Sequence, residues 1–120
     1  GLASYADSIL DRWFGESMRH DRVNLAPWKN MLVRSPLAGY LGTSAAIAAS
    51  DMTGSTSELT MPVMALVGEY DGATSPELVQ GTAELCGADF HIIANAGHLP
   101  CVEQPGQTAT HIKEFLEKTV

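Results

Sequence analysis

Two side chains in the second half of the chain have the types and the spacing of a catalytic pair. Asp71 follows Gly68 by three residues and His98 follows Ile93 by five, each after an apolar run typical of a strand. Ligand sites of parallel sheets lie beyond the carboxyl ends of the strands, so neighbouring strand ends could bring carboxylate and imidazole into hydrogen-bond reach. A carboxylate that holds an imidazole acting as general base forms two members of a nucleophilic triad.

Each residue also has a plain structural interpretation. Asp71 could cap a turn, and His98 could be a histidine in a surface loop. Their occurrence at successive predicted strand ends favours the catalytic interpretation.

Residues 61–120 predict a strand, helix, strand, helix unit. The run from Met61 to Gly68 is nearly continuous in apolar residues, which is typical of a strand covered on both faces and therefore of a parallel sheet. Two strands alone do not make a stable parallel sheet, so the sheet is expected to be incomplete. The other predicted elements are a helix capped by Thr74 or Ser75, with Pro76 in its first turn, that runs to Cys86-Gly87, a strand at 90–93, and a helix from Gln104 to the end.

Residues 1–50 predict three helices. Apolar residues recur at helical spacing from Leu2 to Trp13, and this helix should end near Gly15, which leaves His20 in a loop. A second helix is expected from Asn24, whose side chain can cap it, up to Pro36. A third covers about residues 37–50, and its small residues suggest close approach to another element. Residues 51–60 are a linker.

The composition excludes several classes of protein. The chain has 120 residues and a net charge of −7, whereas a nucleic-acid binder needs a basic surface. The longest uncharged run, residues 35–50, is too short and too rich in glycine and proline to span a membrane. Cys86 and Cys101 are expected to be free thiols in a cytoplasmic protein. The histidines and cysteines show no metal-ligand spacing, and no metal or other cofactor is expected.

The order and spacing of these motifs resemble the C-terminal part of α/β-hydrolases. The resemblance covers about residues 60–120 and is carried by Gly68-Glu69-Tyr70-Asp71, Ala96-Gly97-His98-Leu99-Pro100 and Glu103-Gln104-Pro105. It implies an α/β fold in which a helical cap segment, residues 1–50, precedes the C-terminal part of the parallel sheet. It also implies that Asp71 is the triad acid and His98 the triad base. Residues 1–50 add a looser resemblance to the cap of 3-oxoadipate enol-lactonases, which implies hydrolysis of a lactone.

The nucleophile of that family is absent from this sequence. The family places its serine in a Gly-x-Ser-x-Gly elbow, and no such string occurs here. The nearest string contains Ser44, which falls on a predicted helical stripe. The expectation is therefore a fragment or one chain of a split hydrolase, inactive alone, whose N-terminal part supplies the serine. The alternatives are another hydrolase of this fold (an esterase, a cofactor-free haloperoxidase or a carbon–carbon hydrolase) and a non-catalytic hydrolase-derived binding module.

The substrate is expected to be a small ester or lactone. Since the cap of such a fold faces the strand ends, we expect four apolar residues to line the cavity: Trp13, Trp28, Met31 and Leu99. Residues 1–50 hold five basic residues against four acidic ones, whereas residues 51–120 hold two against ten. This balance suggests that Arg12, Arg19 and Arg22 attract an anionic substrate.

Overall fold

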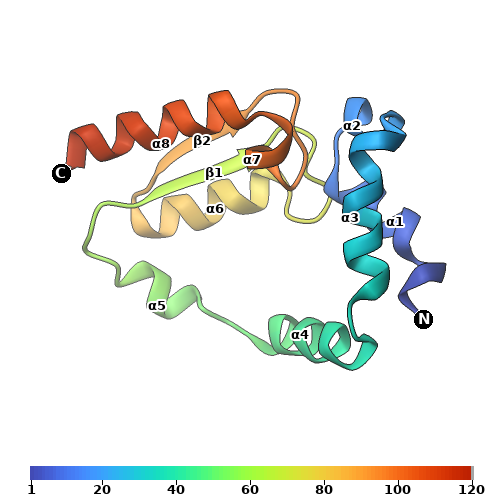
Figure 1. Cartoon of the computed structure of the whole chain (residues 1–120). Coiled ribbons are helices and arrows are strands. Elements are labelled where there is room, and N and C mark those ends of the chain that lie inside the picture. Colours follow the sequence, from blue (N-terminus) through green and yellow to red (C-terminus); the bar gives the residue numbers. More distant parts are fainter. Residues whose placement is uncertain (120) are drawn as a thin grey trace.

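The computed structural model describes residues 1–119, and the first half of this range is helical (Figure 1). Its elements are a 3₁₀ turn η1 (Leu2–Ser4) and the helices α1 (Ala6–Trp13), α2 (Glu16–His20), α3 (Arg22–Arg34), α4 (Leu37–Ala49) and α5 (Thr53–Ser57). The stripe predicted from Leu2 onward is thus divided between η1 and α1.

An apolar cluster holds the first helices of the cap segment together. Leu10 and Phe14 pack against Leu32 of α3, and all three are almost completely buried. The Phe14 ring lies 5.9 Å from the ring of Trp28, centroid to centroid. Burial of each such side chain stabilises the fold by roughly 1.5–3 kcal/mol. The cluster therefore fixes α1 and the residues that follow it, which contact the second half of the chain.

Two predictions about the cap segment are wrong in detail. Helix α3 begins at Arg22, because the Asp21 carboxylate accepts the backbone N–H groups of Val23 and Asn24. The Asn24 side chain donates to Asp21 instead of capping the helix. His20 is the last residue of α2 and does not lie in a loop.

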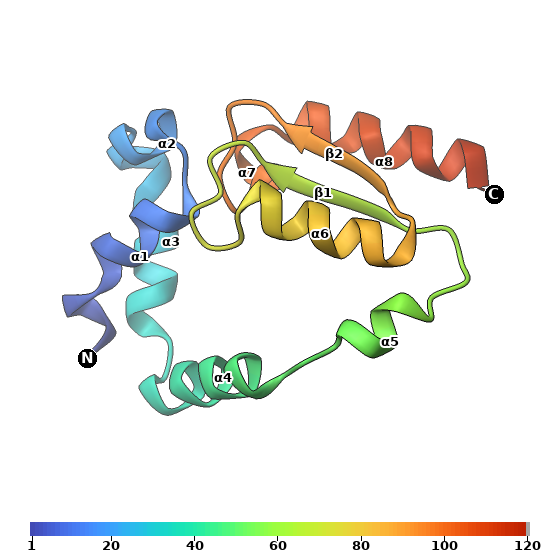
Figure 2. The ribbon, with the colours of Figure 1, turned by 180° about the vertical axis from the view of Figure 1, so that it is seen from behind.

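Helix α4 lies along an open side of the molecule (Figure 2). All its residues except Tyr40 are exposed, so the close neighbour predicted from its small residues is not found within residues 1–119. The linker 51–60 contains α5, which starts where the Asp51 carboxylate accepts the N–H of Thr53.

The second half is a parallel strand pair between two helices, as predicted. Strand β1 (Met64–Gly68) pairs with β2 (Asp89–Ile93) in parallel, with Gly68 opposite Ile93. Helix α6 (Pro76–Cys86) connects them and lies on one side, while α8 (Pro105–Thr119) lies on the other (Figures 1 and 2). The short helix α7 (Pro100–Glu103) precedes α8. The final helix was predicted to reach the end of the chain, and Val120 lies outside the described residues.

Local signals in the sequence explain the bounds of α6. The Ser75 hydroxyl accepts the N–H of Leu78, and Pro76 occupies the first helical position, where no N–H is needed. Gly87 ends the helix with a φ of 63°, the left-handed conformation that glycine adopts without strain. The strands that this helix connects pair directly, so their carboxyl ends lie side by side.

The remaining global expectations concern thiols and membranes. Cys86 and Cys101 are free, as predicted. Within residues 1–119, no helix has both the length and the apolar character needed to cross a bilayer.

Candidate active site

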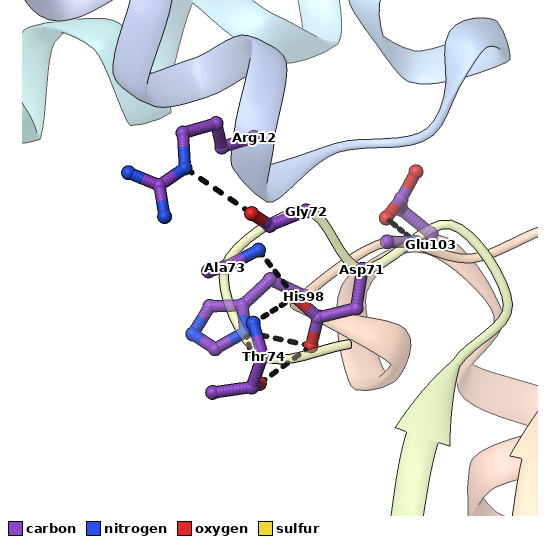
Figure 3. A network of polar contacts seen from close by, with 8 residues as sticks. Arg12, Asp71, Gly72, Ala73, Thr74, His98 and Glu103 are labelled. Atoms are coloured by element: carbon purple, nitrogen blue, oxygen red, sulfur yellow. Dashed lines mark hydrogen bonds and ion pairs between the residues drawn. The ribbon is translucent and has the colours of Figure 1, made fainter. Parts of the chain in front are cut away.

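Asp71 and His98 meet beyond the carboxyl ends of β1 and β2. The Nδ1–H of His98 donates to Oδ2 of Asp71 over 2.8 Å (Figure 3). The Asp71 side chain is 4% exposed and that of His98 is 35% exposed. A buried carboxylate thus holds an imidazole that is open to solvent. Because Nδ1 carries the proton in this bond, Nε2 is left as the basic nitrogen.

Hydrogen bonds keep the Asp71 carboxyl ionised. Oδ1 accepts the backbone N–H groups of Ala73 and Thr74, each at 2.8 Å, and Oδ2 accepts the Thr74 hydroxyl at 2.9 Å as well as the His98 ring. Burial alone raises the pKa of Asp71, but these hydrogen bonds outweigh it and leave the pKa below its usual value. The carboxylate is therefore charged at neutral pH.

The loop that carries His98 is anchored at several points. The His98 N–H donates to the carbonyl of Trp13 over 2.6 Å, and the Gly97 N–H donates to the Glu103 carboxylate over 2.6 Å. Asn95 takes a left-handed φ of 57°, and its N–H donates to the Glu69 side chain. These bonds fix the backbone of residues 95–98, which leads into the imidazole.

The loop that carries Asp71 is fixed to the same part of the cap segment. The Gly72 N–H donates to the carbonyl of Arg12, and the Arg12 Nε–H donates to the carbonyl of Gly72, both over 3.1 Å. The end of α1 therefore contacts both loops of the pair, through Arg12 and Trp13, and Figure 3 shows the contact of Arg12.

An open cavity of about 540 Å³ adjoins the imidazole. His98 lines it together with Trp13 and residues of the α3–α4 connection and α4: Ser35, Pro36, Gly39, Tyr40, Thr43, Ser44 and Ile47. Apart from His98, this lining holds no ionisable side chain other than the phenol of Tyr40. Ser44 lies on α4, and its hydroxyl donates to the carbonyl of Tyr40, within its own helix. Within residues 1–119, no serine hydroxyl bonds to His98.

The structure separates the other predicted substrate residues. Trp13 lines the cavity beside His98. Trp28 and Leu99 pack against the apolar cluster of the cap segment, and Met31 borders a different hollow. Among the arginines, Arg12 contacts the Asp71 loop, whereas Arg19 and Arg22 line a hollow between α1, α2 and α3. The roles of these residues stay predictions.

Two residues, Thr74 and Glu103, make contacts in the site that were not predicted for them. Thr74 was considered only as a helix cap, yet it donates its N–H and its hydroxyl to Asp71. Glu103 was noted only within a family motif, and its carboxylate binds two loops. The spacing Asp-x-x-Thr is the available signal for the first, because a side-chain oxygen commonly accepts the N–H three residues later. The role of Glu103 depends on its bond to Gly15, which is 88 residues away in the sequence, and residue spacing does not reveal such a contact.

The comparisons with known proteins place this geometry in context. No family model matches the chain. It is 29% identical over 109 residues to 3-oxoadipate enol-lactonase 1 of Acinetobacter baylyi, and the match covers 88% of this chain and 40% of that protein. A solved structure of a thermophilic esterase from Thermogutta terrifontis, with malate bound, superposes with a TM-score of 0.87 at 29% identity. That match covers 99% of this chain and 45% of the esterase.

The chain therefore spans less than half of each of these hydrolases. The superposition covers both the helical segment and the strand pair, so the α/β fold predicted from the motifs is confirmed. By sequence and by fold, the chain is similar to part of an enol-lactonase and to part of an esterase, consistent with its resemblance to the C-terminal part of α/β-hydrolases.

Proposed function

We propose that the chain supplies the acid, Asp71, and the base, His98, of a serine-type hydrolase that opens lactones. The observation that carries the proposal is the 2.8 Å bond between a buried carboxylate and a half-buried imidazole beside a cavity. Similarity to an enol-lactonase and to an esterase supports the same reaction class, because lactones are cyclic esters. The nucleophilic serine comes from a segment outside these 120 residues.

The acid–base steps follow from the orientation of the imidazole. Nε2 of His98 takes the proton of the serine hydroxyl as its oxygen attacks the lactone carbonyl, and Asp71 stabilises the imidazolium that forms. Backbone N–H groups of the other segment hold the oxyanion, where loss of one donor costs roughly 10²–10³ in rate. His98 then returns the proton to the leaving oxygen as the ring carbon–oxygen bond breaks. With an enol leaving group the product rearranges to a ketone.

The second half of the reaction uses the same imidazole. Nε2 takes a proton from water, the resulting hydroxide attacks the acyl-enzyme, and the serine leaves with the proton from His98. Throughout, Asp71 keeps its charge, because its hydrogen bonds favour the carboxylate.

The cap segment forms most of the cavity lining and so bears on the substrate. The matches to the enol-lactonase and to the esterase both extend into it, at the same identity, so the preference for an anionic lactone depends on the charges beside the pair. Arg12 is the cation nearest the pair among the three arginines, through its bond to Gly72. We propose that it favours an anionic lactone. An Arg12→Gln variant that kept its affinity for the anionic substrate, and the salt dependence of that affinity, would contradict this part.

A chimeric enzyme tests the proposal. The part of the Acinetobacter baylyi enol-lactonase that precedes the aligned region is joined to this chain, and hydrolysis of an enol-lactone and of a p-nitrophenyl ester is measured. The expected result is lactone hydrolysis that disappears in His98→Ala and persists in His20→Ala, since His20 lies on α2 away from the pair. Near-normal kcat in His98→Ala would remove His98 from the mechanism.

The same panel separates the alternatives. Faster hydrolysis of the ester than of the lactone would favour an esterase, the activity named for the Thermogutta terrifontis protein. A folded chimera without activity on either substrate would favour a non-catalytic binding module.

A further inference from the structure

A second carboxylate joins the loop of His98 to the cap segment. Glu103 is the last residue of α7 and is half-buried. Its Oε2 accepts the N–H of Gly97 at 2.6 Å, and its Oε1 accepts the N–H of Gly15 at 2.8 Å. Figure 3 shows Glu103 near the Asp71 loop, on the side away from the imidazole. The proposed mechanism gives this carboxylate no chemical step.

Both bonds of Glu103 end next to groups that hold His98. Gly97 immediately precedes His98, and the His98 N–H itself donates to the carbonyl of Trp13 over 2.6 Å. Gly15 lies two residues after Trp13. The Glu103 carboxylate therefore fixes two stretches of backbone. One is the loop at Gly97, and the other is the segment at Gly15, next to the Trp13 carbonyl that accepts the His98 N–H.

The contact between the two segments leaves no spare room. A β-carbon on Gly97 would lie 2.5 Å from the carbonyl oxygen of Trp13 and 2.9 Å from the nitrogen of Gly15. Both glycines are buried. The loop can approach the cap segment this closely only because residue 97 has no side chain, and Glu103 satisfies the two backbone N–H groups that burial would otherwise leave without partners.

We propose that Glu103 is a positioning residue that keeps the His98 imidazole in hydrogen-bond register with Asp71. The catalytic consequence rests on the proposed function, whereas the positioning is a property of the loop itself. A carboxylate is suited to this task, because its two oxygens each accept a charge-assisted bond. In Glu103→Gln one of the two N–H groups would face an amide NH₂ and lose its acceptor.

Nuclear magnetic resonance of the full 120-residue chain tests the positioning without any activity. In Glu103→Gln we expect the amide proton of Gly15 or of Gly97 to lose its downfield shift, and the Nδ1–H resonance of His98 to weaken. Glu114→Gln, an equal loss of charge on an exposed position of α8, should leave these resonances unchanged. Unchanged resonances of Gly15, Gly97 and His98 in Glu103→Gln would overturn the proposal.

Kinetics of the chimeric hydrolase test the catalytic consequence. Displacement of a catalytic group by about 1 Å costs about 10²-fold, so we expect Glu103→Gln to lower kcat by about that factor with KM changed less than about twofold. Glu103→Asp keeps the charge but is one methylene shorter, and an intermediate kcat is expected. It also serves as the second variant if Glu103→Gln does not fold.

The outcomes separate positioning from plain stability and from the proposed function. A role in stability alone would lower Tm and leave kcat per folded molecule and the His98 resonance as they are, which would overturn the proposal. If His98→Ala retained activity, the proposed function would fail, while the resonance experiment would still decide whether Glu103 orients the imidazole.

Discussion

At the scale of single residues, Asp71 and His98 lie in different environments, one buried and one partly exposed. Asp71 is buried but receives four hydrogen bonds, so its charge is stabilised without access to water. His98 keeps one nitrogen on this carboxylate and has a side chain that is 35% exposed. The charge of Asp71 is thereby fixed by its hydrogen bonds, whereas the His98 side chain is partly open to solvent.

The lowered pKa of Asp71 predicts how stability depends on pH. A carboxyl whose pKa falls on folding stabilises the native state above its unfolded pKa of about 3.9, and this contribution is lost as the pH falls through the folded value. The free energy of unfolding of the wild type should therefore exceed that of Asp71→Asn most at about pH 6 and least at about pH 2.5. Urea denaturation at both pH values measures the difference. An equal difference at the two pH values would be inconsistent with this view of Asp71.

Thr74 offers a test of the hydrogen bonds themselves. Thr74→Val keeps the shape of the side chain but removes the hydroxyl that donates to Oδ2 of Asp71. A hydrogen bond to a charged group is worth about 1.5–3 kcal/mol, so unfolding in urea at neutral pH should show a loss of that order. Thr74→Ser retains the hydroxyl and should lose much less. Equal stability of the two variants would show that the hydroxyl contributes little.

At the scale of elements, the site depends on a close meeting of two loops and the end of α1. The end of β1 is packed even more tightly than the Gly97 loop, because a β-carbon on Gly68 would overlap the carbonyl oxygen of Gly97 and lie 2.5 Å from that of Ala96. Gly68 and Gly97 thus let backbone pack directly on backbone where these segments meet. The elements that meet here are separated by long stretches of sequence.

Gly97→Ala should therefore be costly in a way that an ordinary glycine substitution is not. Its methyl group would meet backbone atoms of Trp13 and Gly15, which cannot move aside as a side chain can. Overpacking of this kind costs about 1–3 kcal/mol. Gly81→Ala on α6, where nothing lies within 4 Å, should instead stabilise by about 0.5–1 kcal/mol. Thermal unfolding of both variants measures the contrast, which would be absent if the loop relaxed freely.

The sequence predicted the local parts of this arrangement better than the distant ones. Ser75, Pro76 and Gly87 determine the bounds of α6 through bonds within a few residues, so composition was enough. The start of α3 was missed because Asp21 and Asn24 are both good capping residues, and only the geometry shows which carboxylate or amide turns inward. The Glu103–Gly15 and Trp13–His98 bonds join residues more than 80 positions apart, and no periodicity encodes them.

At the scale of the whole molecule, the chain is more extended than a compact domain of its length. Its radius of gyration is 16.0 Å, against about 13–14 Å expected for 120 residues. Its accessible surface is 7939 Å², against about 6,300 Å² expected for 12.8 kDa. The excess is consistent with the open flank of α4 and with a sheet of only two strands within residues 1–119.

Exposed apolar side chains around the strand pair lead to the last prediction. Leu78 and Leu85 on α6, Ile92 on β2, and Ile112 and Leu116 on α8 are each at least 42% exposed. If further strands and helices of a hydrolase cover this region, the chain alone should bind a hydrophobic dye such as anilinonaphthalene sulfonate, and the chimeric enzyme should bind much less of it per molecule. Fluorescence titration at equal concentrations measures both. The reason is that a side chain covered by an added strand or helix no longer offers apolar surface to the dye. Equal dye binding by chain and chimera would mean that the added segment leaves these side chains uncovered, which would contradict the prediction.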